Sequence, residues 1–326
     1  MEEVFIGVDL GGTNIKAGCF DAQYNLIAKT SVPTGVEKGP EFIVENIIRT
    51  SRLLLEENHI ELSRLACVGI GSPGPLNRST GIIIDAMNLG LRNVPLRQMV
   101  SEGMGVRAVL ENDANAACWG EYVLGAGKGV ENMVFFTLGT GIGGGVVSHG
   151  RLIHGIADNA AELGHIIVHP DGRLCGCGQR GCVEAYASAS NTAKRAMEAL
   201  QTGTESSLRK VLDDAGAITC KDVFEHQAAG DKLASEIVDG TAKALGLVCV
   251  SLFHVLEPSR VVFAGGMIAA GEVLLNRIRY FFSQHIWRLQ KENLEICFAT
   301  LGEDAGIIGS AALAIQAYKE AIPHGQ

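Results

Sequence analysis

The feature of this 326-residue chain that most constrains its fold is a short unit that occurs twice: an apolar strand, a glycine turn and a second strand. The first copy has the strand 4–10 (VFIGVDL) followed by Gly-Gly-Thr, and the second has 133–138 (MVFFTL) followed by Gly-Thr-Gly, about 128 positions later. Such a repeat predicts an internal duplication of one α/β fold, although two glycine turns could also coincide by chance.

The rest of the chain alternates between strand and helix patterns, as an α/β fold requires. We expect a first domain of residues 1–113 together with about 305–326, and a second domain of residues 114–304. In this arrangement the last helix returns to the first domain. Further strands are expected at 15–20, 26–32, 65–70, 106–110, 260–264 and 294–299, and helices at 41–58, 234–256 and 305–321.

Composition limits the classes of function. Asp and Glu number 36 against 27 Lys and Arg, which argues against nucleic-acid binding because a nucleic-acid binder needs a basic face. No basic segment precedes an apolar run near Met1, and the longest apolar stretch, 244–256, is too short to span a membrane. We therefore expect a cytoplasmic protein without nucleic-acid or membrane partners, whose scattered cysteines are small core residues in a reducing compartment. These cysteines are Cys19, Cys67, Cys118, Cys220, Cys249 and Cys297.

The two glycine turns expose backbone N–H groups that can hold an anion such as a phosphate. Asp9 lies just before the first turn, where its carboxylate is placed to hold a magnesium ion or its waters. A third glycine pair, Gly265-Gly266, follows the strand at 260–264. The alternative is that each turn is a tight hairpin without a ligand. None is a Walker loop, because no Gly-Lys-Ser/Thr follows.

A carboxylate also stands at the end of the strand at 106–110, in the stretch Leu110-Glu111-Asn112-Asp113. In an open α/β sheet the carboxyl ends of the strands face the crevice where ligands bind, so Asp113 is a candidate catalytic residue. The alternative is that Asn112 or Asp113 caps the helix that follows. A strand-end aspartate alone does not decide between the two.

Three of the nine cysteines fall within the eight-residue stretch CGCGQRGC. A disulfide is disfavoured in a reducing compartment, and a thioredoxin-like redox pair needs two intervening residues, whereas Cys175 and Cys177 have one. A structural zinc ion needs four sulfur or nitrogen ligands, and with Cys182 the cluster supplies three. His165, ten residues before Cys175, is a sensible donor for the fourth position, and His169 is the alternative.

A metal-bound His165 would present its second ring nitrogen in a fixed direction. Glu162 precedes it by three residues, and Glu184 follows Cys182 by two. Two carboxylates and a histidine gathered by one metal ion suit a polyol, because carboxylates accept hydrogen bonds from sugar hydroxyls. Each glutamate taken singly could equally be a solvated helix acid.

Five motifs, in this order, resemble those of the ROK family of sugar kinases and repressors: DLGGT at 9–13, ENDANA at 111–116, LGTGIGGG at 138–145, ELGH at 162–165 and CGCGQRGCVE at 175–184. The resemblance covers essentially the whole chain. It implies an α/β fold of the actin-like ATPase type, a ribonuclease H-like duplication with two domains and an interdomain cleft. It also implies transfer of phosphate from ATP to the 6-hydroxyl of glucose, with Mg²⁺, a structural Zn²⁺, and a homodimer or homotetramer.

The resemblance assigns roles to the positions that match the family's motifs. Asp113 would be the general base, and His165 rather than His169 the fourth zinc ligand. The implied sugar contacts are Gly74, Asn88, Asn112, Asp113, Glu162, His165 and Glu184. The implied nucleotide and magnesium contacts are Asp9, Gly11, Gly12, Thr13, Gly139, Thr140, Gly141, Gly265 and Gly266. The implied zinc ligands are His165, Cys175, Cys177 and Cys182.

Several alternatives share these motifs. A kinase of the same family could act on N-acetylmannosamine, N-acetylglucosamine, fructose or allose, and polyphosphate could replace ATP as donor. A repressor of the family carries a DNA-binding domain before the first glycine motif, and the position of Asp9 leaves no room for one. A sugar sensor without catalysis would not need an intact Asp113 and both glycine turns.

Overall fold

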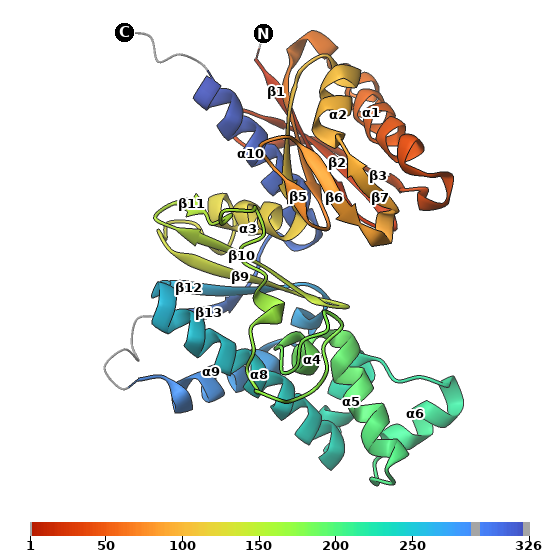
Figure 1. Cartoon of the computed structure of the whole chain (residues 1–326), viewed down its shortest axis with the longest axis vertical. Coiled ribbons are helices and arrows are strands. Elements are labelled where there is room, and N and C mark those ends of the chain that lie inside the picture. The colour runs from red at the N-terminus through yellow and green to blue at the C-terminus, as the bar shows by residue number, and fades with distance from the viewer. Residues whose placement is uncertain (1, 288–293, 322–326) are drawn as a thin grey trace. The chain divides into compact units, whose positions relative to one another are not determined.

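The computed structural model describes residues 2–287 and 294–321 (Figure 1). The chain folds into two compact units. Unit 1 comprises Met1–Lys128, Leu152–Ala160 and Thr300–Gln326, and unit 2 comprises Gly129–Arg151 and Ala161–Ala299.

Unit 1 is built on a five-stranded sheet. Its strands are β1 (Val4–Leu10), β2 (Asn14–Asp21), β3 (Leu26–Pro33), β4 (Leu65–Ser72) and β8 (Arg107–Asn112). They lie in the order β3-β2-β1-β4-β8. The first three pair antiparallel as the predicted meander, and β4 and β8 extend the sheet in parallel. Nearly every residue of β1 is buried, as expected for a central strand that is covered on both faces.

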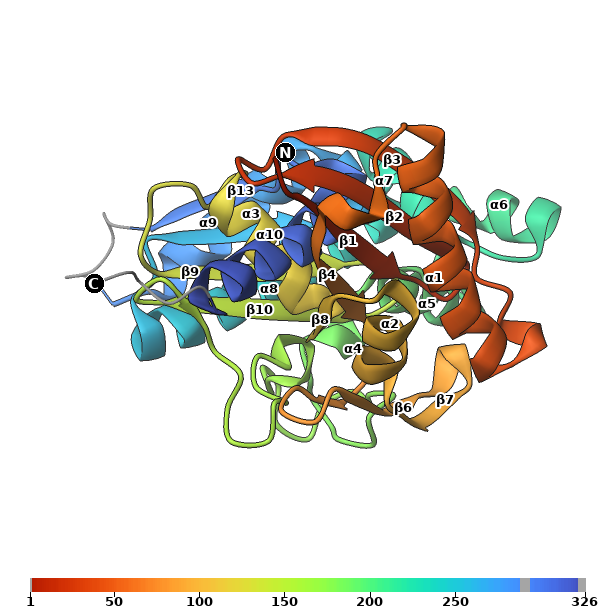
Figure 2. The ribbon, with the colours of Figure 1, turned by 90° about the horizontal axis from the view of Figure 1, so that it is seen from above.

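Helices cover both faces of this sheet (Figure 2). They are α1 (Pro40–Glu57), α2 (Leu96–Met104), α3 (Asp113–Val123) and α10 (Ala305–Ala321). α1 and α2 pack on one face, and α10, with α3 against it, packs on the other. α10 lies directly on the strands: a Cβ atom at Gly7 would come within 2.0 Å of the Ile307 carbonyl oxygen, and one at Gly69 within 1.8 Å of that of Ser310. Only glycine permits such an approach of helix and sheet backbones.

The sequence patterns did not predict a second, three-stranded antiparallel sheet in unit 1. Its strands are β5 (Leu76–Asn77), β6 (Ile82–Ala86) and β7 (Leu91–Val94). β5 has two residues, and burial does not alternate along β6 and β7, so no period of two marks these strands. Their buried side chains, such as those of Leu76 and Ile83, belong to the same apolar cluster as those of α1 and α2.

Unit 2 repeats the sheet of unit 1. Its strands are β9 (Met133–Leu138), β10 (Ile142–Ser148), β11 (Arg151–Leu152), β12 (Arg260–Ala264) and β13 (Glu295–Phe298). Their order is β11-β10-β9-β12-β13, with β10 antiparallel to β9, and β12 and β13 added in parallel. The strand order and these pairing directions match those of unit 1, which confirms the predicted duplication.

The helices of unit 2 are α4 (Glu184–Ala187), α5 (Ala189–Gln201), α6 (Leu208–Ala215), α7 (Cys220–Ala228), α8 (Lys232–Leu256) and α9 (Glu272–His285). α8 is central and packs against α4, α5, α7 and α9. By length and composition α8 could cross a membrane, but 67% of its most apolar window is buried inside the protein. It is the long buried helix that the sequence predicted at 234–256.

The structure divides the chain at a different place from the expected boundary after Asp113. α3 follows Asp113 directly and packs on α10, where a Cβ atom at Gly309 would lie 1.6 Å from the Ala116 carbonyl oxygen. α3 therefore belongs to unit 1, and so does the segment Leu152–Ala160. These contacts join residues far apart in the chain, which periodicity does not detect. Residues 1 and 322–326 of the expected first domain and 288–293 of the expected second domain lie outside the described residues.

The prediction that the scattered cysteines are core residues is correct for four of them and wrong for two. Cys220 and Cys297 are half-buried. The prediction used the apolar residues next to each cysteine in the sequence. Burial depends instead on which other elements pack against the helix or strand that carries the cysteine. The buried ones are Cys19, Cys67, Cys118 and Cys249.

Candidate active site

The first glycine turn joins β1 to β2 in unit 1. Thr34 holds this turn: its Oγ1 donates to the Gly11 carbonyl oxygen (2.6 Å) and its N–H to that of Thr13 (2.9 Å). A Cβ atom at Gly12 would lie 3.4 Å from Nδ2 of Asn88. The structure therefore places Asn88, an implied sugar contact, against the turn that was assigned to phosphate.

Asp9 lies beside this turn with its side chain half-buried. Burial and the charge of Asp113 raise the pKa of Asp9 to about 6, while Lys16 acts in the opposite direction. Two carboxylates that disfavour each other's ionised form are good ligands for a cation. The pair fits the Mg²⁺ that the sequence implied, because this ion prefers one or two carboxylates and keeps several waters.

The corner between β8 and α3 shows which residue caps the helix. Asn112 is the N-cap, and its side-chain oxygen accepts hydrogen bonds from the N–H groups of Ala114 (3.0 Å) and Asn115 (3.2 Å). Asp113 is the first helical residue, and its Oδ1 accepts from the Ala114 N–H (2.8 Å). Burial raises the pKa of Asp113, and hydrogen bonds from Ala114 and Asn112 offset part of this rise. A strand-end carboxylate with a raised pKa has the position and proton affinity of a general base.

Gly74, an implied sugar contact, has a packing reason to be glycine. Its φ is 86°, and a Cβ atom there would lie 2.2 Å from the Asp85 carbonyl oxygen. A side chain at this position would push the loop after β4 away from β6. The structure thus explains Gly74 through the shape of the loop.

The second glycine turn joins β9 to β10 in unit 2, and a hydrogen bond from the Gly139 N–H to the Gly141 carbonyl oxygen (3.0 Å) closes it. Glu184, at the start of α4, reaches this turn: its Oε2 accepts a hydrogen bond from the Ile142 N–H (2.8 Å). Its Oε1 lies 3.6 Å from Sγ of Cys175. Glu184 therefore connects the glycine turn to the cysteine cluster, a link that the sequence did not predict.

A cavity of about 500 Å³ lies beside the second turn, within unit 2. Gly139, Thr140 and Gly266 line it. Gly265 has a φ of 91°, and a Cβ atom there would lie 2.4 Å from the Leu138 carbonyl oxygen, so glycine is needed to bring the turns after β9 and β12 together. Further wall residues are Ala189, Cys220, Phe224, Gln227, Met267 and Val273. A cavity of this size, with mostly apolar walls and two glycine turns at its edge, suits a nucleoside that carries phosphates.

The three clustered thiols and His165 lie together in unit 2 as four possible metal ligands. Their ligand atoms all lie within 4.8 Å of one another. Sγ of Cys175 is 3.7 Å from Nδ1 of His165, and Sγ of Cys177 is 3.7 Å from Sγ of Cys182. Around a tetrahedral zinc ion such pairs lie about 3.6 to 3.8 Å apart, and a disulfide needs about 2.05 Å. The residues therefore fit a zinc ion held through Nδ1 of His165, which leaves Nε2 of that ring for another partner.

The choice between the two candidate histidines is also clear. The ring of His169 packs on that of Tyr186, with centroids 4.7 Å apart, whereas His165 is the histidine grouped with the cysteines. Gly181 has a φ of 83°, and a Cβ atom there would lie 1.9 Å from the His169 carbonyl oxygen. This glycine lets the loop fold back so that Cys182 meets the other ligands.

The implied site residues fall into two sets, one in each unit. Unit 1 holds Asp9, Gly11, Gly12, Thr13, Gly74, Asn88, Asn112 and Asp113, and unit 2 holds Gly139, Thr140, Gly141, Glu162, His165, Glu184, Gly265, Gly266 and the three cysteines. The sequence reasoning missed the wall that α7 contributes to the cavity, because an amphipathic helix gives no local sign of what it faces. It also missed the contacts of Glu111. The one sequence signal that could have indicated them is that Glu111 directly precedes Asn112.

Comparisons with known proteins identify relatives along the whole chain. The model of the ROK family matches residues 5–317. The chain is 38% identical over 313 residues to a glucokinase of Halalkalibacterium halodurans, covering 96% of this chain and 95% of that protein. It is 33% identical over 310 residues to an N-acetylmannosamine kinase of Citrobacter koseri, covering 95% of this chain and 98% of that protein.

A solved structure agrees with these relatives. The crystal structure of a ROK family glucokinase from Streptomyces griseus, in complex with glucose and AMPPNP, matches with a TM-score of 0.79 at 35% identity, covering 96% of this chain and 99% of that chain. The two repeated sheets thus form the actin-like ATPase fold that the resemblance implied. The chain belongs to the ROK family.

Proposed function

We propose that this protein is a sugar kinase that transfers the γ-phosphoryl group of ATP to the 6-hydroxyl of glucose. The observation that carries this proposal is Asp113, a carboxylate with a raised pKa that Asn112 orients at the end of a parallel strand. The similarity to glucokinases along nearly the whole chain supports the choice of substrate pair.

Asp113 accepts the proton of the 6-hydroxyl as the hydroxyl oxygen attacks the γ-phosphorus, and ADP leaves as the bond to its bridging oxygen breaks. The raised pKa gives Asp113 a higher proton affinity than an ordinary aspartate. Orientation is the main contribution that a protein makes to phosphoryl transfer. The hydrogen bonds from Ala114 and Asn112 supply that orientation.

The nucleotide would bind in the cavity of unit 2, with adenosine against the apolar wall and phosphates at the glycine turns. A Cβ atom at Gly139 would have no neighbour within 4 Å, so no side chain or backbone atom there keeps a phosphate from the turn. Asp9 would hold Mg²⁺, which neutralises phosphate charge when it is bound.

On the sugar side, His165, Glu162 and Glu184 would contact hydroxyl groups. Nδ1 of His165 lies in the cysteine cluster, so its Nε2 is the nitrogen that meets a ligand. A zinc ion held by this cluster would fix the ring and its tautomer. Glu184 uses Oε2 for the glycine turn, and its Oε1, beside Sγ of Cys175, is the oxygen that would accept from a hydroxyl once the thiol has given up its proton to bind zinc.

A panel of sugars tests the proposal: kcat/KM is measured with ATP for glucose, N-acetylmannosamine, N-acetylglucosamine and fructose. We expect glucose to exceed the others by at least about 10-fold, because a 2-acetamido group needs extra room. N-acetylmannosamine is the second candidate, since a kinase for that sugar is 33% identical. A higher kcat/KM for N-acetylmannosamine would make that sugar the proposed substrate in place of glucose. A lack of turnover on every sugar would refute the proposed kinase activity. Polyphosphate in place of ATP tests the donor.

A further inference from the structure

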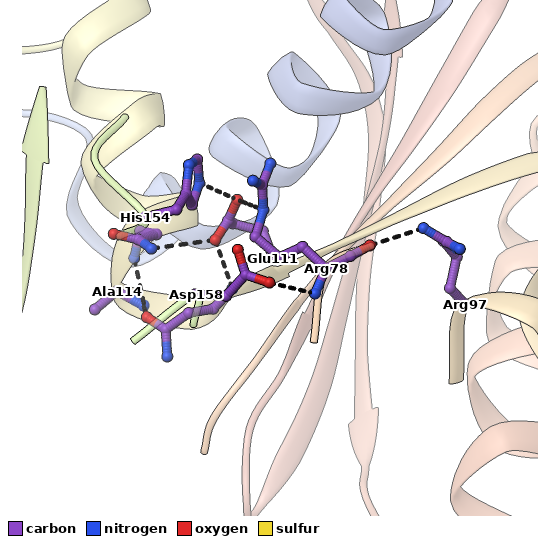
Figure 3. A network of polar contacts seen from close by, with 8 residues as sticks. Arg78, Arg97, Glu111, Ala114, His154 and Asp158 are labelled. Carbon is purple, nitrogen blue, oxygen red and sulfur yellow. Dashed lines mark hydrogen bonds and ion pairs between the residues drawn. The ribbon is translucent and has the colours of Figure 1, made fainter. Parts of the chain in front are cut away.

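Glu111, the residue before Asn112, has a carboxylate that makes three hydrogen bonds and one ion pair, the latter with Arg78 (Figure 3). Its side chain is 2% exposed. Oε1 accepts hydrogen bonds from the Asn112 N–H (3.0 Å) and from Nδ2 of Asn115 (3.1 Å). Oε2 pairs with Nε of Arg78 (2.8 Å) and Nε2 of His154 (2.9 Å). Burial works to raise the pKa of Glu111, but the contacts with His154 and Arg78 outweigh it and lower the pKa, so this carboxylate is ionised.

The two partners on Oε2 are themselves held in place. Arg78 follows β5, and its N–H donates to Oδ2 of Asp158 (2.9 Å), while its carbonyl oxygen accepts from the guanidinium of Arg97 on α2 (2.8 Å). His154 and Asp158 both lie on the segment Leu152–Ala160. The network therefore ties the turn after β5, the start of α2 and this segment to the end of β8, all within unit 1.

Oε1 of Glu111 faces the corner that carries the proposed base. The Asn112 N–H is held by Glu111, and the Asn112 side-chain oxygen accepts from the Ala114 N–H, which also donates to Oδ1 of Asp113. A continuous series of contacts thus runs from Glu111 through Asn112 to Asp113. A buried ion network is weak evidence of a stabilising role, because apolar side chains of similar volume often serve as well. Its location at this corner points to a different use.

We propose that Glu111 is a positioning residue for phosphoryl transfer, and that its clamp of Arg78 and His154 fixes the Asn112 backbone and thereby the direction of the Asp113 carboxylate. This inference rests on the proposed function. Glu111 takes no proton in the reaction and acts through Asn112. Since small displacements of a reacting group cost large factors in rate, its loss lowers kcat and leaves nucleotide binding in unit 2 unchanged.

The test measures kcat of Glu111→Gln with glucose and ATP, divided by the number of sites that bind AMPPNP in calorimetry. The new side-chain amide places a second N–H donor against Arg78, so the contacts of residue 111 with Arg78 and His154 are lost. We expect kcat per site to fall at least about 10-fold, while the Kd of AMPPNP changes less than about 2-fold. Removing the competing donor with Arg78→Met in the same chain is expected to restore kcat at least about 3-fold over Glu111→Gln alone.

Glu121→Gln is the matched control. Glu121 is also a fully buried carboxylate of unit 1, but it accepts hydrogen bonds from the backbone N–H groups of Ala126, Thr300 and Leu301. We expect this variant to lose stability and to keep kcat per site within about 2-fold of the wild type. If Glu111→Gln does not fold, Arg78→Lys is the second variant, because Arg78 is 35% exposed, and its kcat per site is expected to fall at least about 3-fold.

A kcat per site within about 2-fold of the wild type in Glu111→Gln, or in Arg78→Lys where the first variant is unfolded, overturns the positioning role. An equal loss in Glu121→Gln overturns it too, because any buried charge would then have the same effect. In those cases the wild type still turns over. A wild type that phosphorylates no sugar refutes the proposed function and this inference with it.

Discussion

Units 1 and 2 repeat one sheet, but their matching turns differ at the position that precedes the turn leucine. Unit 1 has Asp9 before Leu10, and unit 2 has Thr137 before Leu138. Burial and Asp113 raise the pKa of Asp9 to about 6. Thr137 instead accepts a hydrogen bond from the Gly143 N–H (3.2 Å) and so supports its own hairpin. The duplication therefore supplies two glycine turns but places an acid beside only one of them.

The connections between matching strands differ even more. Between β3 and β4, unit 1 has one long helix, α1, besides short turns. Between β11 and β12, unit 2 has the four-ligand cluster and helices α4 to α8, which include walls of the cavity. The two sheets are alike, whereas the connections between their strands differ and hold the cysteine cluster and walls of the cavity. Functional groups often lie on connections that a rigid scaffold positions. Each unit can therefore be disabled separately.

The largest expected effect is the loss of kcat when the proposed base of unit 1 is replaced, while the binding properties of unit 2 stay unchanged. Asp113→Asn is expected to lower kcat at least about 100-fold, the usual scale for loss of a general base. AMPPNP affinity and zinc content, which report on unit 2, stay unchanged. Asp21→Asn is the control, since Asp21 supports the turn after β2 through the N–H groups of Gln23 and Asn25. Near-normal turnover of Asp113→Asn would refute its assignment.

The second prediction concerns a substitution that removes a ligand of the cysteine cluster in unit 2 and leaves unit 1 unchanged. Cys177→Ala removes one of four ligands, so the chain is expected to lose its zinc in elemental analysis. Because His165 is then no longer fixed, the KM for glucose is expected to rise at least about 10-fold. Cys220→Ala, on α7, is expected to retain the metal. Equal zinc contents in the two variants would contradict a metal site at the cluster.

The third prediction compares two glycines of unit 2 with nearly the same φ. Gly265 (91°) lies against the Leu138 backbone, whereas a Cβ atom at Gly230 (89°) would meet open space. Gly265→Ala is expected to cost about 1–3 kcal/mol more in free energy of unfolding than Gly230→Ala and to raise the KM for ATP. Urea unfolding and steady-state kinetics measure both effects. Equal behaviour of the pair would show that the close approach of the two turns is unimportant.

The smallest effect concerns the turn position that differs between the units. The pKa of Asp9 is raised from 3.8 to about 6, so the folded state binds this proton more tightly than the unfolded state. That contribution to stability is complete below a pH of about 4 and is lost as the pH rises through about 6. Asp9→Asn is therefore expected to gain stability relative to the wild type as the pH rises from about 4 to about 8.

Urea unfolding at several pH values measures the difference in free energy of unfolding between Asp9→Asn and the wild type. Thr137→Val at the matching position of unit 2 is the control, because it removes no titrating group, and its stability difference is expected to be independent of pH. A gap for Asp9→Asn that widens toward acid would mean that the ionised carboxylate stabilises the fold.

Local pattern predicted much of the fold, since strand alternation and helical spacing are properties of short windows. The strands of both glycine turns and α8 and α10 lie where these patterns placed them. β5 was missed because it has only two residues, and β6 and β7 because burial does not alternate along them. α3 was assigned to the wrong side of the boundary because its place depends on Gly309, almost 200 positions from Ala116.

The candidate site divides in the same way. Residue types with fixed chemistry stand out in one dimension, and Asp113, the three cysteines and the glycine turns were identified from them. The choice of His165 over His169, the capping by Asn112 and the walls of the cavity depend on which atoms meet in space. The clamp around Glu111 depends on this too, because Arg78 and His154 lie on segments far from β8 in the chain.

The sequence by itself determined the repeated sheet, the two glycine turns and the set of groups able to bind metal or accept a proton, because backbone freedom and side-chain chemistry are local properties. Only the tertiary structure decided how those groups are tuned. The pKa of Asp9 rises and that of Glu111 falls because of neighbours brought in from elsewhere in unit 1. Burial and charge act through space and not along the chain.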